Sequence, residues 1–170
     1  MDVRIEQQHV EVHKFYAGAV VGTVLLALVL QAFLPLHFRW ASNIELTLLV
    51  TIYFALSRRN PSSGLLLGMV IGLAQDSLGH TPLGLYGISK TVVGFFASSF
   101  GSRIDVEHPI SRFLLTLFFF YIHDFVFVLT QRVLLAQREP FITPRLIISS
   151  VVNATLALAL FPLLDRLRSS

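Results

Sequence analysis

Six apolar stretches follow one another along the chain, separated by short polar segments. They cover residues 15–34, about 40–56, 64–78, 83–100, about 112–135 and about 146–164. The first has 20 residues, enough for an α-helix to cross about 30 Å of hydrocarbon, whereas the third is short for a span. The pattern predicts an all-α polytopic membrane protein, a compact bundle of six transmembrane helices with short loops. Residues 15–166 would form this single domain, after a polar tail at 1–14.

Composition supports a lipid-solvated core. Hydrophobic residues make up 54% of the chain, charged residues only 14%, and the mean hydropathy is +0.71. A soluble domain would carry roughly a quarter charged residues. The chain has no cysteine, which excludes disulfides, thiolate metal sites and a cysteine nucleophile. The basic residues are spread through short loops and form no patch, so no nucleic-acid partner is expected.

The distribution of Lys and Arg predicts the orientation. If both termini share one side, that side holds eight basic residues: Arg4, Lys14, Arg58, Arg59, Arg103, Arg112, Arg166 and Arg168. The other side holds four: Arg39, Arg132, Arg138 and Arg145. Basic loops stay in the cytoplasm, so both termini are predicted to be cytoplasmic.

Small residues repeat along the third stretch. Gly64, Gly68 and Gly72 recur every fourth residue, which stacks them on one helix face and allows a close approach of a neighbouring backbone. Gly18 and Gly22 form one further pair of this spacing in the first stretch, and we expect it to pack within the bundle.

A tight turn follows the glycine stripe. Asp76 continues the stripe, and the segment after it contains Gly79, suited to a helix C-cap. Thr81 is a candidate N-cap of the next helix, with Pro82 in its first turn. The stretch therefore predicts a helical hairpin with a polar tip, facing outward.

Apart from Arg112 and Arg132 near the ends of the fifth stretch, the predicted spans contain four charged residues, all at or above mid-depth on the outer side: Glu45, Asp76, Lys90 and Asp124. Because a charge in hydrocarbon costs several kcal/mol, these side chains should face the bundle interior and pair. We expect Asp76 and Lys90 to interact across the hairpin. If they act separately, Asp76 would cap backbone amides or contact a partner, and Lys90 would pair with Asp124. A structural lock is the simplest role for this polar cluster, ahead of a ligand or proton pathway or a partner contact.

No catalytic or cofactor-binding pattern is visible. His123 and Asp124 are adjacent and point to different faces of a helix, which argues against a metal site. The chain lacks nucleophile-elbow, zinc-protease, phosphate-loop and dinucleotide fingerprints. A non-enzymatic protein without a cofactor is predicted.

The hairpin resembles the signature of the rod shape-determining protein MreD family, in which a glycine-rich helix runs into an Asp and a Pro-Leu-Gly turn. The match rests on these positions: Gly68, Gly72, Asp76, Pro82, Leu83 and Gly84. Chain length and the six-span hydropathy fit over essentially the whole sequence. Gln75 departs from the family pattern, where an apolar residue is expected.

This resemblance implies a multi-pass protein of the bacterial inner membrane that acts in the cell-elongation machinery. It would bind MreC and support RodA and its class-B penicillin-binding protein in lateral peptidoglycan synthesis, together with MreB. No catalytic residue is implied. The outer polar cluster would shape a cavity near the MreC-binding region.

A second interpretation comes from a different class of protein. The substrate-binding membrane subunit of a vitamin-type, energy-coupling factor transporter also uses about six short-looped helices and an outward-facing pocket. The polar cluster favours it, and so do Gly18, Ala19 and Gly22, which would dock a coupling subunit.

Overall fold

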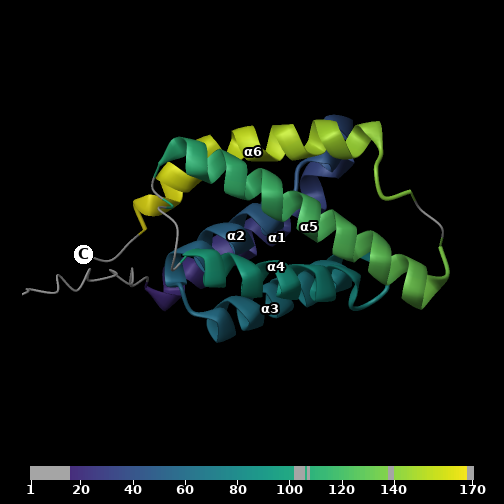
Figure 1. The fold of residues 1–170 in the computed structure, drawn as a ribbon, viewed down its shortest axis with the longest axis horizontal. Helices are drawn as coiled ribbons and strands as arrows, with labels where there is room; N and C mark the ends of the chain where they lie inside the picture. The colour runs from purple at the N-terminus through teal and green to yellow at the C-terminus, as the bar shows by residue number, and fades with distance from the viewer. Residues whose placement is uncertain (1–15, 102–105, 107, 138–139, 168–170) are drawn as a thin grey trace, which may run out of the picture.

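The computed structural model describes residues 16–101, 106, 108–137 and 140–167. In that part of the chain it contains six α-helices, one short 3-10 helix and no strand, so the all-α prediction is confirmed (Figure 1). The elements are α1 (Ala17–His37), η1 (Arg39–Asn43), α2 (Leu46–Arg58), α3 (Pro61–Gly79), α4 (Leu85–Gly101), α5 (Pro109–Leu135) and α6 (Pro144–Asp165). The predicted tail at 1–14 lies outside the described residues.

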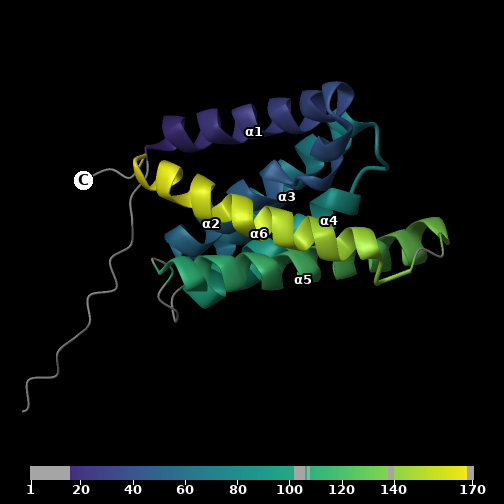
Figure 2. The same ribbon diagram turned by 90° about the horizontal axis from the view of Figure 1, so that it is seen from above.

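The helices run back and forth between two ends of the bundle (Figures 1 and 2). One end, called the loop end here, carries the connections 38–45, 80–84 and 136–143. Helix α6 ends at the opposite end of the bundle, where Arg112 and Asp165 form an ion pair of 2.7 Å. This alternation brings connections that are distant in sequence to one end of the molecule.

Helix α2 lies at the centre of the fold. It contacts each of the other five helices, and its residues 47–57 are all buried. With only 13 residues it measures about 20 Å at 1.5 Å per residue, too short for a regular span. A helix enclosed on all sides need not be long, because it meets protein and not lipid along its length.

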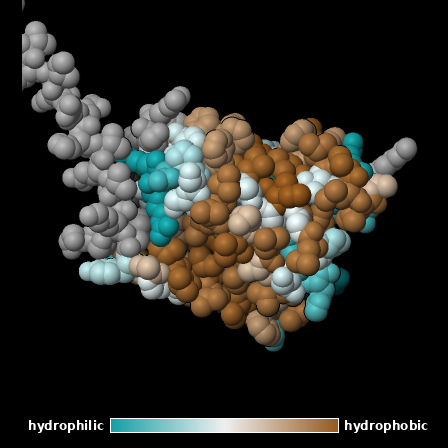
Figure 3. All heavy atoms as spheres, turned by 90° about the horizontal axis from the view of Figure 1, so that it is seen from below, coloured by the Kyte–Doolittle hydropathy of each residue, from teal (hydrophilic) through white to brown (hydrophobic). Residues whose placement is uncertain are grey.

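Three helices, not six, are long and apolar enough to cross a membrane: α1, α5 and α6. The prediction of six spans overestimated this number. Helices α3 and α4 carry small and polar residues on the faces that they bury against each other, which lowers their hydropathy. On the face shown in Figure 3, apolar side chains form a broad band between polar residues at the two ends.

The second apolar stretch does not form one helix. Residues 40–56 were predicted as a continuous span, but η1 and an extended segment precede α2, which starts at Leu46. Amide side chains take up the backbone hydrogen bonds of this segment. Gln31 donates to the Ile44 carbonyl and accepts from the Leu46 N–H, while Asn153 accepts from the Glu45 N–H. Irregular backbone can lie within a membrane bundle when side chains of the protein bond to its N–H and C=O groups, as they do here.

The expected packing of Gly18 and Gly22 is wrong. Both glycines are exposed, and a Cβ added to either would meet no atom within 4 Å among the described residues. Helix α1 packs against α2 and α3, and its backbone does not approach that of α6, so a groove lined by Gly22 separates these two helices. Two small residues at the right spacing permit a close contact but do not require one.

Candidate functional site

The glycine stripe forms the closest helix contact in the bundle. A Cβ on Gly68 would overlap the carbonyl oxygen of Lys90, and one on Gly72 would overlap the carbonyl oxygen of Tyr86. Gly64 lies in the same way against Gly94 of α4. Helices α3 and α4 therefore touch backbone to backbone along most of their length, and any larger side chain at these glycines would push them apart.

The turn between α3 and α4 differs from its prediction. Gly79 is the last residue of α3, and His80 adopts the left-handed conformation with φ of 53°. Helix α4 starts at Leu85, so Thr81 and Pro82 precede it by several residues and do not form its first turn. The C-cap of α3 is therefore His80, one residue after the predicted Gly79.

Asp76 caps the start of α4. Its carboxylate accepts hydrogen bonds from the backbone N–H groups of Gly84, Tyr86 and Gly87 at 2.9–3.1 Å, and from the Thr81 hydroxyl at 2.9 Å. The side chain is fully buried. A carboxylate at a helix N-terminus satisfies free N–H groups and complements the helix dipole. Asp76 is therefore a fully bonded structural acid, and the predicted Asp76–Lys90 contact is wrong.

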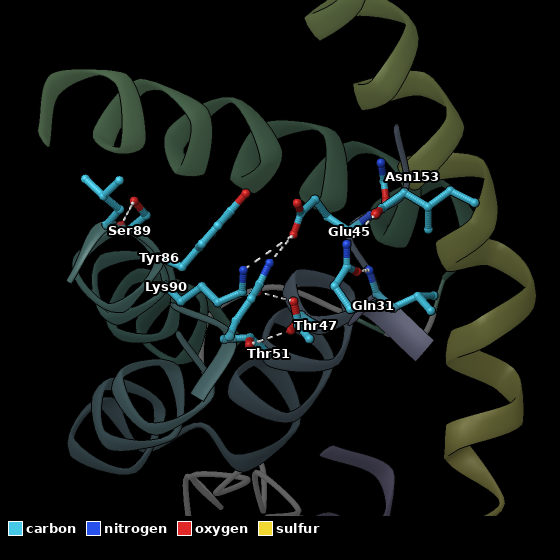
Figure 4. A network of polar contacts seen from close by, with 12 residues as sticks. Gln31, Glu45, Thr47, Thr51, Tyr86, Ser89, Lys90 and Asn153 are labelled. Carbon is cyan, nitrogen blue, oxygen red and sulfur yellow. Dashed lines mark hydrogen bonds and ion pairs between the residues drawn. The ribbon is translucent and has the colours of Figure 1, made fainter. Parts of the chain in front are cut away.

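Lys90 pairs with Glu45 instead (Figure 4). Its Nζ lies 3.5 Å from Glu45 Oε2 and 4.7 Å from the centre of the Tyr86 ring. Lys90 is fully buried, whereas 17% of the Glu45 side chain is exposed. The pair joins α4 to the start of α2, so the connection that carries Glu45 supplies the counter-charge of the lysine.

Gln75 extends this pair into a network. It accepts a hydrogen bond of 2.6 Å from the Thr47 hydroxyl and donates a long one of 3.4 Å to Glu45 Oε2. Both Gln75 and Thr47 are buried. The residue that departs from the family pattern thus links α3 to α2 beside the Glu45–Lys90 pair.

A cavity of about 360 Å³ lies next to this network, at the loop end. It is lined by η1, α4, α5, α6 and the connection between the last two, with these residues: Ser42, Asn43, Glu45, Tyr86, Phe120, His123, Asp124, Phe127, Val128, Gln131, Pro140, Thr143, Arg145, Leu146 and Ser149. The structure thus brings Glu45 and Asp124 to one cavity. Lys90 lies behind Glu45, and Asp76 lies apart at the turn.

Hydrogen-bonding capacity is left over around the cavity. His123 is 5% exposed and its ring packs against the rings of Tyr86 and Phe127, yet its Nε2 has no hydrogen-bond partner in the described part of the chain. Lys90 Nζ has only its ion pair and the Tyr86 ring. Since buried polar atoms are normally bonded, such exceptions mark a place where something else can bind.

No group of three His, Cys, Asp or Glu side chains that could hold a metal ion occurs in the ranges that the structure describes. His123 and Asp124 are neighbours in sequence, and both line the cavity. Binding is the chemistry that these residues suit.

Sequence reasoning missed several residues of this site. Gln31 and Asn153, which hold the α1–α2 connection, lie in apolar stretches where an amide is costly and so signals a partner. Tyr86 and Arg145 carried no such signal, because an aromatic in an apolar helix and an arginine in a loop are common.

These features define the class of the protein: an all-helical membrane protein that buries a polar cluster and a cavity at one end of its bundle. A family model described as rod shape-determining protein MreD matches residues 13–167, nearly the whole chain. The protein belongs to the MreD family, as the hairpin signature indicated. No curated protein and no solved structure matches it.

Proposed function

We propose that this protein is a non-enzymatic inner-membrane component of the bacterial cell-elongation machinery that binds MreC. In this role it supports RodA, the class-B penicillin-binding protein and MreB in lateral peptidoglycan synthesis. The observation that carries the proposal is the family match over residues 13–167, which leaves no room for a separate catalytic domain in the matched part. The tightly packed α3–α4 hairpin supports a scaffold role, since it fixes two helices rigidly.

The proposal includes a topology. Helices α1, α5 and α6 cross the bilayer and face lipid, the shorter or more polar helices α2, α3 and α4 pack beside them in the same bundle, and both termini are cytoplasmic. Eight basic residues against four support this orientation. Single cysteines at Ser62, His80 and Ser170 can be labelled without background because the chain has no cysteine. An impermeant periplasmic reagent should label His80→Cys only; labelling of Ser170→Cys without His80→Cys would refute the topology.

Affinity purification of the native complex tests the function. MreC should co-purify from gently solubilised membranes. The Gly68→Leu variant, whose hairpin is disrupted, should lose MreC, while the matched Gly22→Leu variant on the open face of α1 keeps the bundle intact. Recovery of a transporter energising module in place of MreC would overturn the proposal.

One observation favours the vitamin-transporter subunit as a second candidate. The cavity at the loop end has a polar lining and a volume of about 360 Å³, enough for a small ligand. Mass spectrometry of the purified protein separates the two functions. A vitamin retained through purification, together with an energising module, would support the transporter.

A further inference from the structure

The charges around the loop-end cavity are arranged in two zones. The partly buried lining residues Glu45 and Asp124 are called the inner wall here, and the exposed lining residue Arg145 is called the rim. Lys90 does not line the cavity and offsets Glu45 from behind. The inner wall therefore holds one acid that is compensated and one that is not.

Asp124 is the uncompensated acid. It has no hydrogen bond and no ion pair within the described ranges, although it is only partly exposed. Three aromatic rings line the same cavity as Asp124: the Tyr86 and Phe127 ring centres lie 4.7 Å apart, and the His123 ring packs against both. A free carboxylate beside aromatic faces is the environment in which proteins bind an ammonium group.

Arg145 is held in place at the rim. Its Nε donates to Asn43 Oδ1 at 3.0 Å, and its Nη2 donates to the Ser42 carbonyl and hydroxyl oxygens at 3.2 and 3.0 Å. Its Nη1 has no partner in the described part of the chain, and the side chain is exposed. A guanidinium fixed on one edge and free on the other is suited to a phosphate or carboxylate oxygen.

We propose that this cavity binds a small zwitterion of the phosphoethanolamine type. Its ammonium lies at the inner wall against Asp124, among the aromatic residues that line the same cavity, and its phosphate meets Arg145 at the rim. A simple anion would face the inner carboxylates, and a simple cation would leave Arg145 without a counter-ion. Only a ligand with both charges complements both zones.

This ligand chemistry has two sources, a free metabolite or the headgroup of a membrane lipid. The cavity lies at the loop end of the bundle, and Figure 3 shows polar residues at the ends of the apolar band, where headgroups lie if the band spans the bilayer. The proposal does not depend on MreC binding, because every residue that carries it belongs to this chain.

Calorimetric titration of the purified full chain in a non-ionic detergent tests the ligand class. Glycerophosphoethanolamine is the probe, and ethanolamine and glycerol phosphate are the two half-ligands. Each half-ligand should bind at least about tenfold more weakly than the whole probe. Equal binding of ethanolamine and the probe would overturn the zwitterion.

Three variants assign the binding to the cavity. Asp124→Asn and Arg145→Gln should each weaken binding of the probe at least about tenfold. Arg145→Lys, which keeps the charge, should bind the probe with an affinity between those of the parent and Arg145→Gln. Arg166→Gln, an exposed arginine at the opposite end, is the matched control and should bind as the parent does. Unchanged binding by a folded, monodisperse Asp124→Asn protein would refute the site.

A second arm distinguishes the sources. The protein is reconstituted in nanodiscs that contain phosphatidylethanolamine and phosphatidylglycerol in equal amounts, and retained lipid is measured by native mass spectrometry. Selective retention of phosphatidylethanolamine that Asp124→Asn abolishes identifies a lipid headgroup as the source. Binding of the soluble probe without such retention identifies a free metabolite. Absence of both results overturns the proposal.

Discussion

The α3–α4 hairpin and the loop-end cavity use polar residues in opposite ways. In the hairpin, the Asp76 carboxylate has four donors, and the glycines bring two backbones into direct contact. Around the cavity, Asp124 has no partner in the described ranges, and His123 Nε2 is buried without one. A satisfied polar group stabilises a fold, whereas an unsatisfied one beside a cavity is available to a ligand.

Of the variants that test this difference, Gly68→Leu should lose the most stability. The new side chain overlaps the Lys90 carbonyl, and backbone cannot yield as a flexible side chain would. We expect a loss of about 3 kcal/mol or more, seen as little monodisperse protein in detergent. Gly22→Leu, with open space around it, should express normally. Normal folding of Gly68→Leu would mean that α3 and α4 can separate without penalty.

Asp76→Ala should cause the second-largest loss of stability. It removes the acceptor of three backbone N–H groups at the start of α4, at a cost of roughly 3 kcal/mol in denaturant unfolding. Asp76→Asn keeps one acceptor oxygen and should lose about half as much. Ser77→Ala, at the exposed neighbouring position, serves as the control. Equal losses for Asn and Ala would show that the negative charge matters and the cap geometry does not.

A pair of mutant cycles should distinguish the two acids. Glu45→Gln and Lys90→Met should each cost about 2 kcal/mol, and the double variant should recover part of this loss, because each single change leaves a poorly solvated partner. The cycle of Asp76→Asn with Lys90→Met should show less than half of that coupling. A stronger coupling in the Asp76–Lys90 cycle than in the Glu45–Lys90 cycle would show that Lys90 pairs with Asp76 and not with Glu45.

Asp124→Asn should have the smallest effect on stability. The carboxylate bonds to nothing in the described part of the chain, so its replacement should change the unfolding free energy by no more than about 0.5 kcal/mol. The same variant should nevertheless lose probe binding. A large loss of stability would show that Asp124 belongs with the structural acids such as Asp76.

The sequence predicted the glycine stripe better than the residues around it. Gly64, Gly68 and Gly72 repeat with the helix period, so their common face could be derived from local geometry alone. Gly18 and Gly22 have the same spacing and face open space. The difference lies in whether a second helix reaches that face, which depends on contacts that spacing does not encode.

Four charged residues within the apolar stretches were recognised from the sequence, but Lys90 was paired with the wrong acid. Depth along the helices placed Asp76 and Lys90 near each other on consecutive antiparallel helices. The position of a residue along the membrane axis does not show which donors compete for a carboxylate. Here the N–H groups at the start of α4 already bond to the Asp76 carboxylate. Glu45 is brought to Lys90 by an irregular connection that hydropathy cannot distinguish from a helix.

The sequence by itself determined the helical class, the order of the apolar stretches, the small-residue face of α3 and the family, because these follow from periodicity and local motifs. Only the tertiary structure decided that α2 is a short enclosed helix, that Glu45 neutralises Lys90 and that Asp124 and Arg145 share a cavity. The physical reason is the α1–α2 connection, which Gln31 and Asn153 hold inside the bundle. Those amides lie 122 residues apart in the chain, since they occupy positions 31 and 153, and only folding brings them to the same backbone segment.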